Sequence, residues 1–237
     1  QIRAEGVACD VTSRDSLRVA ALETIAKFGK AHMVCNNAGI GAGGPMGLVS
    51  PGDWDWVLDV NLKGVFYGME IFTPLIESHG EGGWFVNTAS MAGMLSPPMM
   101  EPYSATKFAV VAMSEGWAVQ LAPKGIGVSI LCPGFVKTNI IESRRNRSAA
   151  YGPDTSLPLN PDAPVSGVLT GIPPEAVGKR VVEGIKDGDL YIFTHPEFKA
   201  ATQARFDRIL AAFDKSATSP AINALPPRTA PGLNLPQ

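Results

Sequence analysis

Apolar side chains along the chain follow two alternating patterns, which predict strands and helices in turn. Short apolar runs bounded by polar or glycine residues predict strands, and apolar residues three or four positions apart predict amphipathic helices. The predicted strands cover residues 5–11, 32–39, 84–90, 127–132 and 190–194. The predicted helices cover residues 13–28, 51–76, 102–121, 174–186 and 197–214.

Local signals mark the ends of two of these helices. Thr12 followed by Asp15 predicts a capping box at the start of the first helix, and Gly29 predicts its end. Ser50 and Pro51 predict the N-cap and the first position of the second helix.

Strands and helices that alternate with short connections give parallel strands with helices on both faces. We therefore expect an α/β fold, a doubly wound parallel sheet, in one domain over residues 1–215. The proline-rich stretch at 151–174 predicts a mobile lid at about residues 138–173, and the Pro/Ala-rich tail at 216–237 is expected to be disordered. Ligands of such sheets bind at the carboxyl ends of the strands.

Composition excludes several classes of partner. The 237 residues are 45% hydrophobic and 18% charged with a net charge of -2, as in a globular domain without a basic surface for nucleic acid. No apolar run is long enough to cross a bilayer, so we expect no membrane partner. The first residues contain neither a signal peptide nor a methionine, which favours a cytoplasmic location and a truncated N-terminus.

Cysteine and histidine positions give no sign of a metal site. Cys9, Cys35 and Cys132 lie in predicted strands without CxxC spacing, so we expect buried core thiols and no disulfides. The three histidines are far apart in the sequence and are expected to be loop or strand-end residues. They are His32, His79 and His195.

Polar and glycine residues collect where the predicted strands end. They are Asp10 and Val11, Asn36 to Gly39, Ser90, and Pro133 with Gly134. Because the carboxyl ends of parallel strands meet at one edge of the sheet, this distribution predicts a ligand site there.

The helix after Ser90 adds a tyrosine and a lysine. Tyr103 and Lys107 are four residues apart on one helix face, and Tyr103 lies in the first turn. A nearby ammonium and the helix N-terminus both favour phenolate, so this pair could exchange a proton with an alcohol at neutral pH. Ser90 could hydrogen-bond the substrate oxygen, and Asn61 could hold a proton-relaying water.

Each of these residues also has a plainer interpretation. Ser90 could be a turn residue, and Asn61 a satisfied polar residue inside a helix. Tyr103 and Lys107 could form a solvated helix face, and Asp10 could cap the first helix.

Taken together and in order, these residues resemble the short-chain dehydrogenase/reductase family over residues 1 to about 214. The resemblance lies in Asn36-Asn37-Ala38-Gly39, Asn61, Ser90, Tyr103-Ser104-Ala105-Thr106-Lys107 and Pro133-Gly134. It implies that Tyr103 is the general acid/base and that Lys107 lowers the tyrosine pKa and binds the nicotinamide ribose. It also implies that Ser90 orients the substrate and that Asn61 anchors the relay water.

The same resemblance implies NAD or NADP as the cofactor. Asp10 and Val11 would border the adenine, and Asn37, Ala38 and Gly39 the adenosine-ribose side. Val136 and Thr138 would lie near the carboxamide and phosphates. The family's TGxxxGxG pyrophosphate loop does not occur in the sequence, so we expect the first βαβ unit to be missing and cannot assign the choice between NAD and NADP.

A missing βαβ unit has a structural consequence. In the family's strand order 3-2-1-4-5-6-7, residues 7–11 form the third strand and residues 33–38 the fourth, with two strands between them. One edge of residues 33–38 should therefore be unpaired, unless residues 7–11 close onto it directly. We expect the chain alone to be aggregation-prone or partly molten and to bind no dinucleotide.

The substrate and the assembly are suggested less directly. The side chains that flank the predicted site would form an adaptable apolar pocket, although about half could belong to the core; they are Met91, Met94, Met99, Met100 and Phe135. The arginine-rich segment with Arg144, Arg145 and Arg147, and residues 190–195, resemble the branch with Cα-dehydrogenases of lignin-derived aryl ethers, which implies a small apolar or aromatic alcohol or ketone.

We also expect a homodimer or homotetramer through the helices that begin at Pro51 and Pro102. Their aromatic residues suit an interface, or else all pack inside one subunit; they are Trp54, Trp56, Phe66, Phe108 and Trp117.

Two functions therefore remain open at this point. One is an NAD(P)-dependent oxidoreductase that interconverts a secondary alcohol and a ketone. The other is a non-catalytic fragment or degenerate binding module that keeps the fold without the dinucleotide-binding loop.

Overall fold

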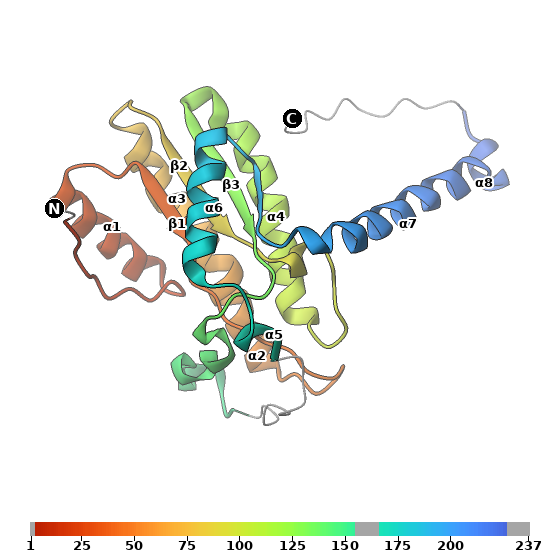
Figure 1. Cartoon of the computed structure of the whole chain (residues 1–237), viewed down its shortest axis with the longest axis horizontal. Helices are drawn as coiled ribbons and strands as arrows, with labels where there is room; N and C mark the ends of the chain where they lie inside the picture. Colours follow the sequence, from red (N-terminus) through yellow and green to blue (C-terminus); the bar gives the residue numbers. More distant parts are fainter. Residues whose placement is uncertain (1–2, 155–165, 227–237) are drawn as a thin grey trace.

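The computed structural model, which describes residues 3–154 and 166–226, contains a four-stranded parallel sheet (Figure 1). Its strands are β1 (Met33–Asn36), β2 (Gly83–Thr88), β3 (Ile126–Cys132) and β4 (Tyr191–Phe193), hydrogen bonded in the order β1-β2-β3-β4. All neighbours are parallel, with Cys35 opposite Val86 and Leu131 opposite Ile192.

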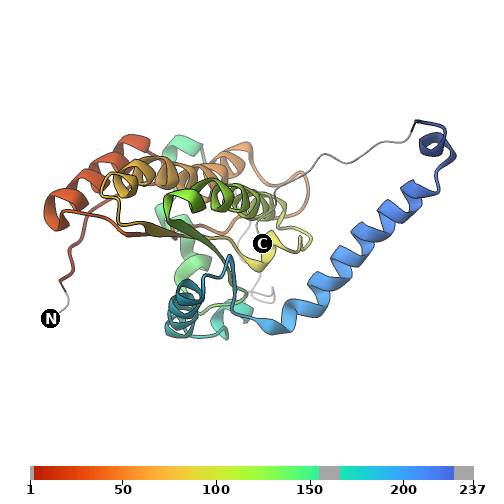
Figure 2. The same cartoon turned by 90° about the horizontal axis from the view of Figure 1, so that it is seen from above.

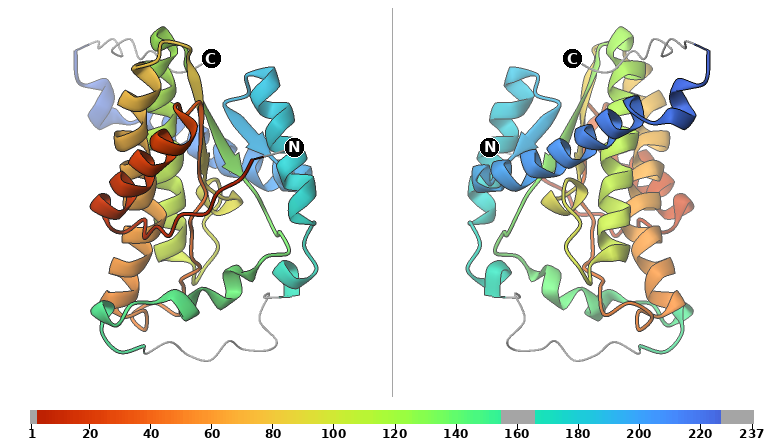
Figure 3. Two further views of the ribbon diagram at one scale, coloured as in Figure 1. Left: turned by 90° about the vertical axis from the view of Figure 1, so that its left-hand side faces the viewer. Right: turned by 90° about the vertical axis from the view of Figure 1, so that its right-hand side faces the viewer.

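Helices cover both faces of this sheet, which confirms the predicted doubly wound α/β class. The longer helices are α1 (Arg14–Phe28), α2 (Pro51–Leu58), α3 (Gly64–Glu77), α4 (Glu101–Leu121), α6 (Pro174–Asp187) and α7 (Lys199–Ala217), and the short ones are α5 (Ser166–Leu169) and α8 (Pro220–Asn223). Helices α1, α3 and α4 lie on one side of the sheet and α6 on the other (Figure 3).

A separate apolar cluster fills each side. On the α3/α4 side, Phe85 and Val128 of the strands pack with Met69 of α3. On the α6 side, Val86, Leu131 and Ile192 pack against one stripe of the helix, formed by Val177, Val181 and Ile185. Burial on both faces explains why the sequences of β2 and β3 are nearly continuous apolar runs.

The long predicted helix from Pro51 is interrupted once. Ser50 caps it as expected, accepting the Asp53 backbone N–H at 3.1 Å. Between α2 and α3 the chain forms a π-helical turn, η1 (Asp59–Lys63), and Asn61 lies in this turn. Such turns commonly occur at functional sites.

The predicted first strand at residues 5–11 does not form, and it does not close onto β1. Residues 3–10 are irregular, and the Asp10 amide donates to the Ser16 hydroxyl instead of to a neighbouring strand. A strand of this kind needs a partner, and among the described residues only β2 pairs with β1. The cap of α1 is also Ser13 rather than Thr12.

Within residues 3–154 and 166–226, the outer edge of β1 has no strand partner, and it borders a groove of about 460 Å³ between α1 and α3. Val11, Phe28 and Val65 contribute apolar side chains to this groove, and residues 30–38 form its floor. Cys9 and Cys35 are exposed, which corrects the prediction that they are buried, whereas Cys132 is buried; all three are free thiols.

The C-terminal part departs from the predictions. Helix α7 extends away from the body (Figure 2), so the apolar residues expected to pack inward are exposed, Phe213 to 68%. Residues 220–223 form α8, which corrects the expectation of disorder for that part of the tail.

The lid is only partly described. Its described part contains the 3-10 segments η4 (Asn139–Asn146) and η5 (Ala149–Tyr151) and the short helix α5. Residues 155–165 of the lid and 227–237 of the tail lie outside the described residues.

Within the described residues, no helix is long and apolar enough to cross a membrane.

Candidate active site

The predicted catalytic residues Ser90, Tyr103 and Lys107 lie together at the carboxyl end of the sheet. Ser90 follows β2 and caps the 3-10 turn η2 (Met91–Gly93), where its hydroxyl accepts the Ala92 N–H at 3.1 Å. Tyr103 and Lys107 lie in the first two turns of α4, with the Lys107 ammonium 5.5 Å from the centre of the Tyr103 ring. All three side chains are buried, which excludes the solvated helix face as an interpretation.

Burial controls the protonation of this pair. Burial raises the pKa of Tyr103, and the hydrogen bond from Ser90 only partly opposes this effect. Burial also lowers the pKa of Lys107 to about 8. The expectation that Lys107 lowers the tyrosine pKa remains a prediction, because desolvation of the phenolate is the larger effect here.

The Lys107 ammonium is 3% exposed, and within the described residues it has one hydrogen-bond acceptor, the Thr88 carbonyl at 2.8 Å. An ammonium has three N–H donors, so two of them remain for another partner. The neighbouring Thr88 hydroxyl donates to Asn37 Oδ1 at 3.2 Å, which links the lysine to the end of β1.

Asn61 is fully buried and binds the loop after β1. Its Oδ1 accepts the Ile40 N–H at 2.8 Å and its Nδ2 donates to the Ile40 carbonyl at 2.9 Å. A Cβ on Gly39 would lie 3.6 Å from Asn61 Oδ1 and 3.7 Å from Lys107 Nζ, so the loop passes directly beside both side chains. The amide is thus occupied by backbone groups, and its predicted role as a water anchor remains a prediction.

The other predicted cofactor residues are spread more widely. Val11, Asn37 and Ala38 line the groove beside β1. Asp10 is exposed, and its carboxylate accepts the backbone N–H and the hydroxyl of Thr12, which is the plainer capping role.

Val136 and Thr138 lie in the segment after β3. Val136 forms a β-bridge with Ile172, and Thr138 is exposed at the start of η4. The preceding Pro133 carbonyl accepts the Ser90 hydroxyl at 3.4 Å, so this segment begins beside the catalytic residues.

Sequence reasoning gave no role of its own to Thr106, and it identified Met99 only as a possible pocket residue. Thr106 is fully buried between Tyr103 and Asn61, donating to the Tyr103 carbonyl at 2.7 Å and accepting Asn61 Nδ2 at 3.4 Å. Met99 has a left-handed backbone with φ 67°, and its carbonyl accepts the Gly44 N–H at 2.8 Å. The position of Thr106 between the predicted site residues Tyr103 and Lys107 was its sequence signal, and no signal marked the left-handed backbone of Met99.

An ionic cluster holds η4 and η5 against the start of α2. The Asp53 carboxylate is 3% exposed and binds Arg147 at 2.9 Å and Arg144 at 3.1 Å. Burial acts to raise the pKa of Asp53, but the hydrogen bonds and charges of the two arginines outweigh it and lower the pKa. The Tyr151 hydroxyl donates to Asp59 at 2.9 Å and closes the cluster.

Comparison with known proteins agrees with this architecture. A family model described as short chain dehydrogenase matches residues 1–149. The chain is 34% identical over 214 residues to "C alpha-dehydrogenase" of Sphingobium sp. strain SYK-6, covering 88% of this chain and 70% of that protein. This similarity confirms the predicted likeness to the branch with Cα-dehydrogenases.

Solved structures give the same result. A short chain dehydrogenase/reductase from Burkholderia phymatum, in complex with NAD, is 35% identical with a TM-score of 0.82 and is matched over 88% of this chain and 76% of that one. LigD from Sphingobium sp. strain SYK-6, in its apo form, is 28% identical with a TM-score of 0.71, over 96% and 78% of the two chains. The matched family model and the identities over most of both chains establish that this protein belongs to the short-chain dehydrogenase/reductase family of oxidoreductases.

Proposed function

We propose that the protein interconverts a secondary alcohol and a ketone with NAD or NADP, and that Tyr103 is the general acid/base. The observation that carries this proposal is the buried group formed by the Ser90 hydroxyl, the Tyr103 hydroxyl and the Lys107 ammonium at the carboxyl end of the sheet. Each hydroxyl has one O–H, so the two together could donate two hydrogen bonds to one substrate oxygen once the Ser90 hydroxyl turns away from the Pro133 carbonyl.

The residues present fit the nicotinamide-ribose end of a dinucleotide. Lys107 has two N–H donors without an acceptor in the described residues, and the loop passes beside its ammonium at a glycine, Gly39. Ribose hydroxyls are suitable acceptors for such a buried ammonium. The TGxxxGxG loop for the pyrophosphate is not in the sequence, so this fit covers one end of the cofactor.

The remaining cofactor contacts are proposed by position. Asn37 and Ala38 would lie along the adenosine-ribose side, with Asp10 and Val11 toward the adenine and Val136 and Thr138 near the carboxamide and phosphates. The Burkholderia phymatum relative, solved in complex with NAD, supports a dinucleotide as the cofactor. When bound, the nicotinamide supplies or accepts the hydride at the carbinol carbon.

The protein side chains then transfer one proton to or from the substrate oxygen. In the reducing direction the Tyr103 hydroxyl donates its proton to the ketone oxygen while Ser90 donates a hydrogen bond to the same oxygen. The raised pKa of Tyr103 keeps the phenol protonated at neutral pH, which suits this direction. In the oxidising direction the phenolate, with Lys107 beside it, would accept the alcohol proton.

The apolar surroundings support an aromatic or other apolar substrate. Met91 and Met94 are buried in the core behind Ser90, which is the alternative expected for about half of the five predicted pocket residues. Met99 and Phe135 are 53% and 43% exposed and remain available for substrate contact. The similarity to C alpha-dehydrogenase favours an aromatic alcohol or ketone.

The test is an assay of phenyl ketone reduction with NADH and NADPH, using protein expressed from its whole reading frame. Replacing Tyr103 with Phe removes the proton donor and should lower kcat by about 100-fold or more. Tyr67→Phe, on the half-buried side of α3, is the matched control and should keep wild-type turnover.

Two outcomes would contradict the proposal. Wild-type turnover in Tyr103→Phe would remove this residue from the chemistry. A wild-type protein that binds dinucleotide but reduces no ketone would instead support the binding-module alternative.

A further inference from the structure

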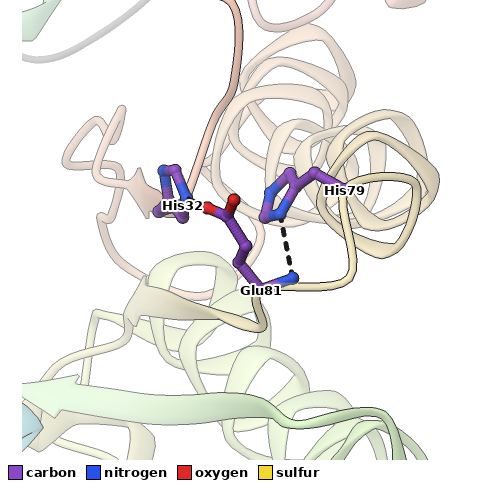
Figure 4. A group of neighbouring side chains, drawn as sticks. All are labelled: His32, His79 and Glu81. Carbon is purple, nitrogen blue, oxygen red and sulfur yellow. Dashed lines mark hydrogen bonds and ion pairs between the residues drawn. The ribbon is translucent and has the colours of Figure 1, made fainter.

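Two histidines and a glutamate meet at the amino end of β1, at the opposite end of the strands from Tyr103 and Lys107 (Figure 4). His32 directly precedes β1, whereas His79 and Glu81 lie in the turn between α3 and β2. One potential metal-ligand atom from each residue lies within 4.8 Å of the other two. His32 and His79 are strand-end and loop residues, as expected, but the fold brings them together.

The backbone holds the three residues in this arrangement. The Trp84 N–H donates to the His32 carbonyl at 2.8 Å, which fixes the end of β1 against the start of β2. Gly80 and Gly82 have φ values of 70° and 74°, so the turn folds back sharply and presents His79 and Glu81 to His32. Such left-handed positions favour glycine because it has no Cβ.

Two of the candidate ligands already share a proton. His32 Nε2 lies 2.7 Å from Glu81 Oε2, while the other carboxylate oxygen binds Lys30. The two imidazole rings are 4.6 Å apart between centroids and tilted by 44°. A metal ion would replace the proton between His32 and Glu81 and leave the Lys30 contact with Oε1 in place.

His79 has the orientation that metal-binding histidines usually have. Its Nε2 donates to the Ala31 carbonyl at 3.0 Å, and its Nδ1 accepts the Glu81 backbone N–H at 3.2 Å. The first bond fixes the tautomer, so the lone pair is on Nδ1, and a metal ion bound there would displace the Glu81 N–H. A ligating histidine typically donates its other ring N–H to a carbonyl or carboxylate in this way.

We propose that His32 Nε2, His79 Nδ1 and Glu81 Oε2 bind a divalent transition-metal ion of the zinc type, with water as the fourth ligand. Two imidazoles and one carboxylate with an open position form a frequent zinc ligand set. Ligand atoms about 2.1 Å from zinc are about 3.4 Å apart in a tetrahedron, so the 2.7 Å contact between His32 and Glu81 would widen by about 0.7 Å on binding. Both side chains are about half exposed and free to make this adjustment.

The ion would connect the edge strand to the rest of the sheet. β1 pairs only with β2 among the described strands, and the site joins the residue before β1 to the turn before β2. We therefore assign it a structural role that leaves the chemistry at Tyr103 unchanged.

The test is calorimetric titration of tag-free, EDTA-treated protein with ZnCl2. The background carries Cys9→Ser and Cys35→Ser, because these exposed thiols could bind zinc themselves. We expect one Zn²⁺ per chain, with affinity weakened at least 10-fold by His32→Gln or His79→Gln. Gln at position 79 still offers a donor to the Ala31 carbonyl.

Two further variants sharpen the result. Lys30→Met removes a competing cation from Glu81 and should strengthen binding. Glu77→Gln, in the same helix-to-turn region but paired with Lys124, should leave the affinity unchanged.

Absence of stoichiometric binding, or an unchanged affinity in both histidine variants, would overturn the proposal. If circular dichroism shows that a histidine variant is unfolded, Co²⁺ titration decides. The folded protein should then give the intense visible absorption of a tetrahedral site, and Glu81→Gln should abolish it; a weak, octahedral-type spectrum would also overturn the proposal.

Discussion

At the scale of single residues, the unusual feature is the buried ammonium of Lys107. It has lost nearly all contact with water and has one described acceptor, so its charged form is costly in the folded chain. A residue that destabilises the fold while facing a ligand site is typical of a functional position. Lys107 therefore supports the proposed site more strongly than the YxxxK spacing alone.

Lys107→Met should separate stability from binding. The variant should be at least as stable as the wild type at neutral pH, because it replaces an incompletely paired buried charge by an apolar side chain of similar length. Dinucleotide affinity should fall by about 10-fold or more, because the variant loses charge-assisted hydrogen bonds to the ribose. Thermal melts and calorimetry on the same samples test this, and a destabilised variant with unchanged affinity would contradict it.

The same residue predicts a pH dependence of stability. Burial lowers the pKa of Lys107 from 10.5 to about 8, so between these pH values the unfolded chain binds the extra proton. The free energy of unfolding of the wild type should therefore rise with pH from about 8 to 10.5, relative to Lys107→Met, by on the order of 3 kcal/mol. Lys179 is exposed, so the unfolding free energy of Lys179→Met should change with pH as that of the wild type does. Urea melts across this pH range measure it. The account would be contradicted if Lys107→Met also changed as the wild type does.

At the scale of elements, local signals predicted those helices and strands whose partners lie in the chain. Helix α4 and strands β2 and β3 formed close to the predicted positions because apolar pattern and tertiary packing agree there. The strand at residues 5–11 did not form, since strand propensity does not supply a neighbour to bond with. The π-turn at Asn61 has the same apolar spacing as the helices around it and left no mark in the sequence.

The cluster around Asp53 should be the main attachment of the η4–η5 segment. Asp53→Asn removes the charge that both arginines bind and leaves the buried Arg147 incompletely paired, so it should cost about 3 kcal/mol of stability at pH 7. Asp55→Asn, exposed two residues away, is the matched control and should change stability by less than about 0.5 kcal/mol.

Acid should remove this difference. The pKa of Asp53 is lowered in the folded chain, so its stabilisation is complete above the pKa of the unfolded chain, about 4, and is lost as the pH falls below that value. Urea melts should therefore show the difference between the wild type and Asp53→Asn shrinking as the pH falls below about 4, by at most about 1.4 kcal/mol per pH unit. A constant difference over this range would show that the carboxylate charge is not what stabilises the segment.

At the scale of the whole molecule, the grouping of Ser90, Tyr103 and Lys107 could be predicted, because the family order places Ser90 at a strand end and the other two at the start of the next helix. The meeting of His32 and His79 could not, since it depends on how β1 and β2 pair. Some of the aromatic residues predicted to form an interface pack inside the subunit instead. Trp56 is buried and Trp117 packs on the core, so Phe66 is the exposed member of the set, and the homodimer or homotetramer remains a prediction.

The unpaired edge of β1 makes a specific prediction about self-association. Met33 is half exposed on this edge, and an open, apolar strand edge favours pairing with another chain. The 237-residue chain alone should self-associate in light-scattering measurements, and Met33→Lys should reduce this by adding a charge to the edge. A wild-type chain that is monomeric and melts cooperatively would contradict the prediction.

The central claim is that the protein interconverts a ketone and a secondary alcohol by hydride transfer with a nicotinamide cofactor. The most direct test uses protein from the whole reading frame, a phenyl ketone, and NADH or NADPH in which both hydrogens on C4 are deuterium. Mass spectrometry then shows whether the product carries deuterium. The account predicts an alcohol that carries one deuterium at the carbinol carbon. Tyr103→Phe should form this alcohol at least about 100-fold more slowly than the wild type. Alcohol without the label, or no alcohol from either cofactor, would contradict it.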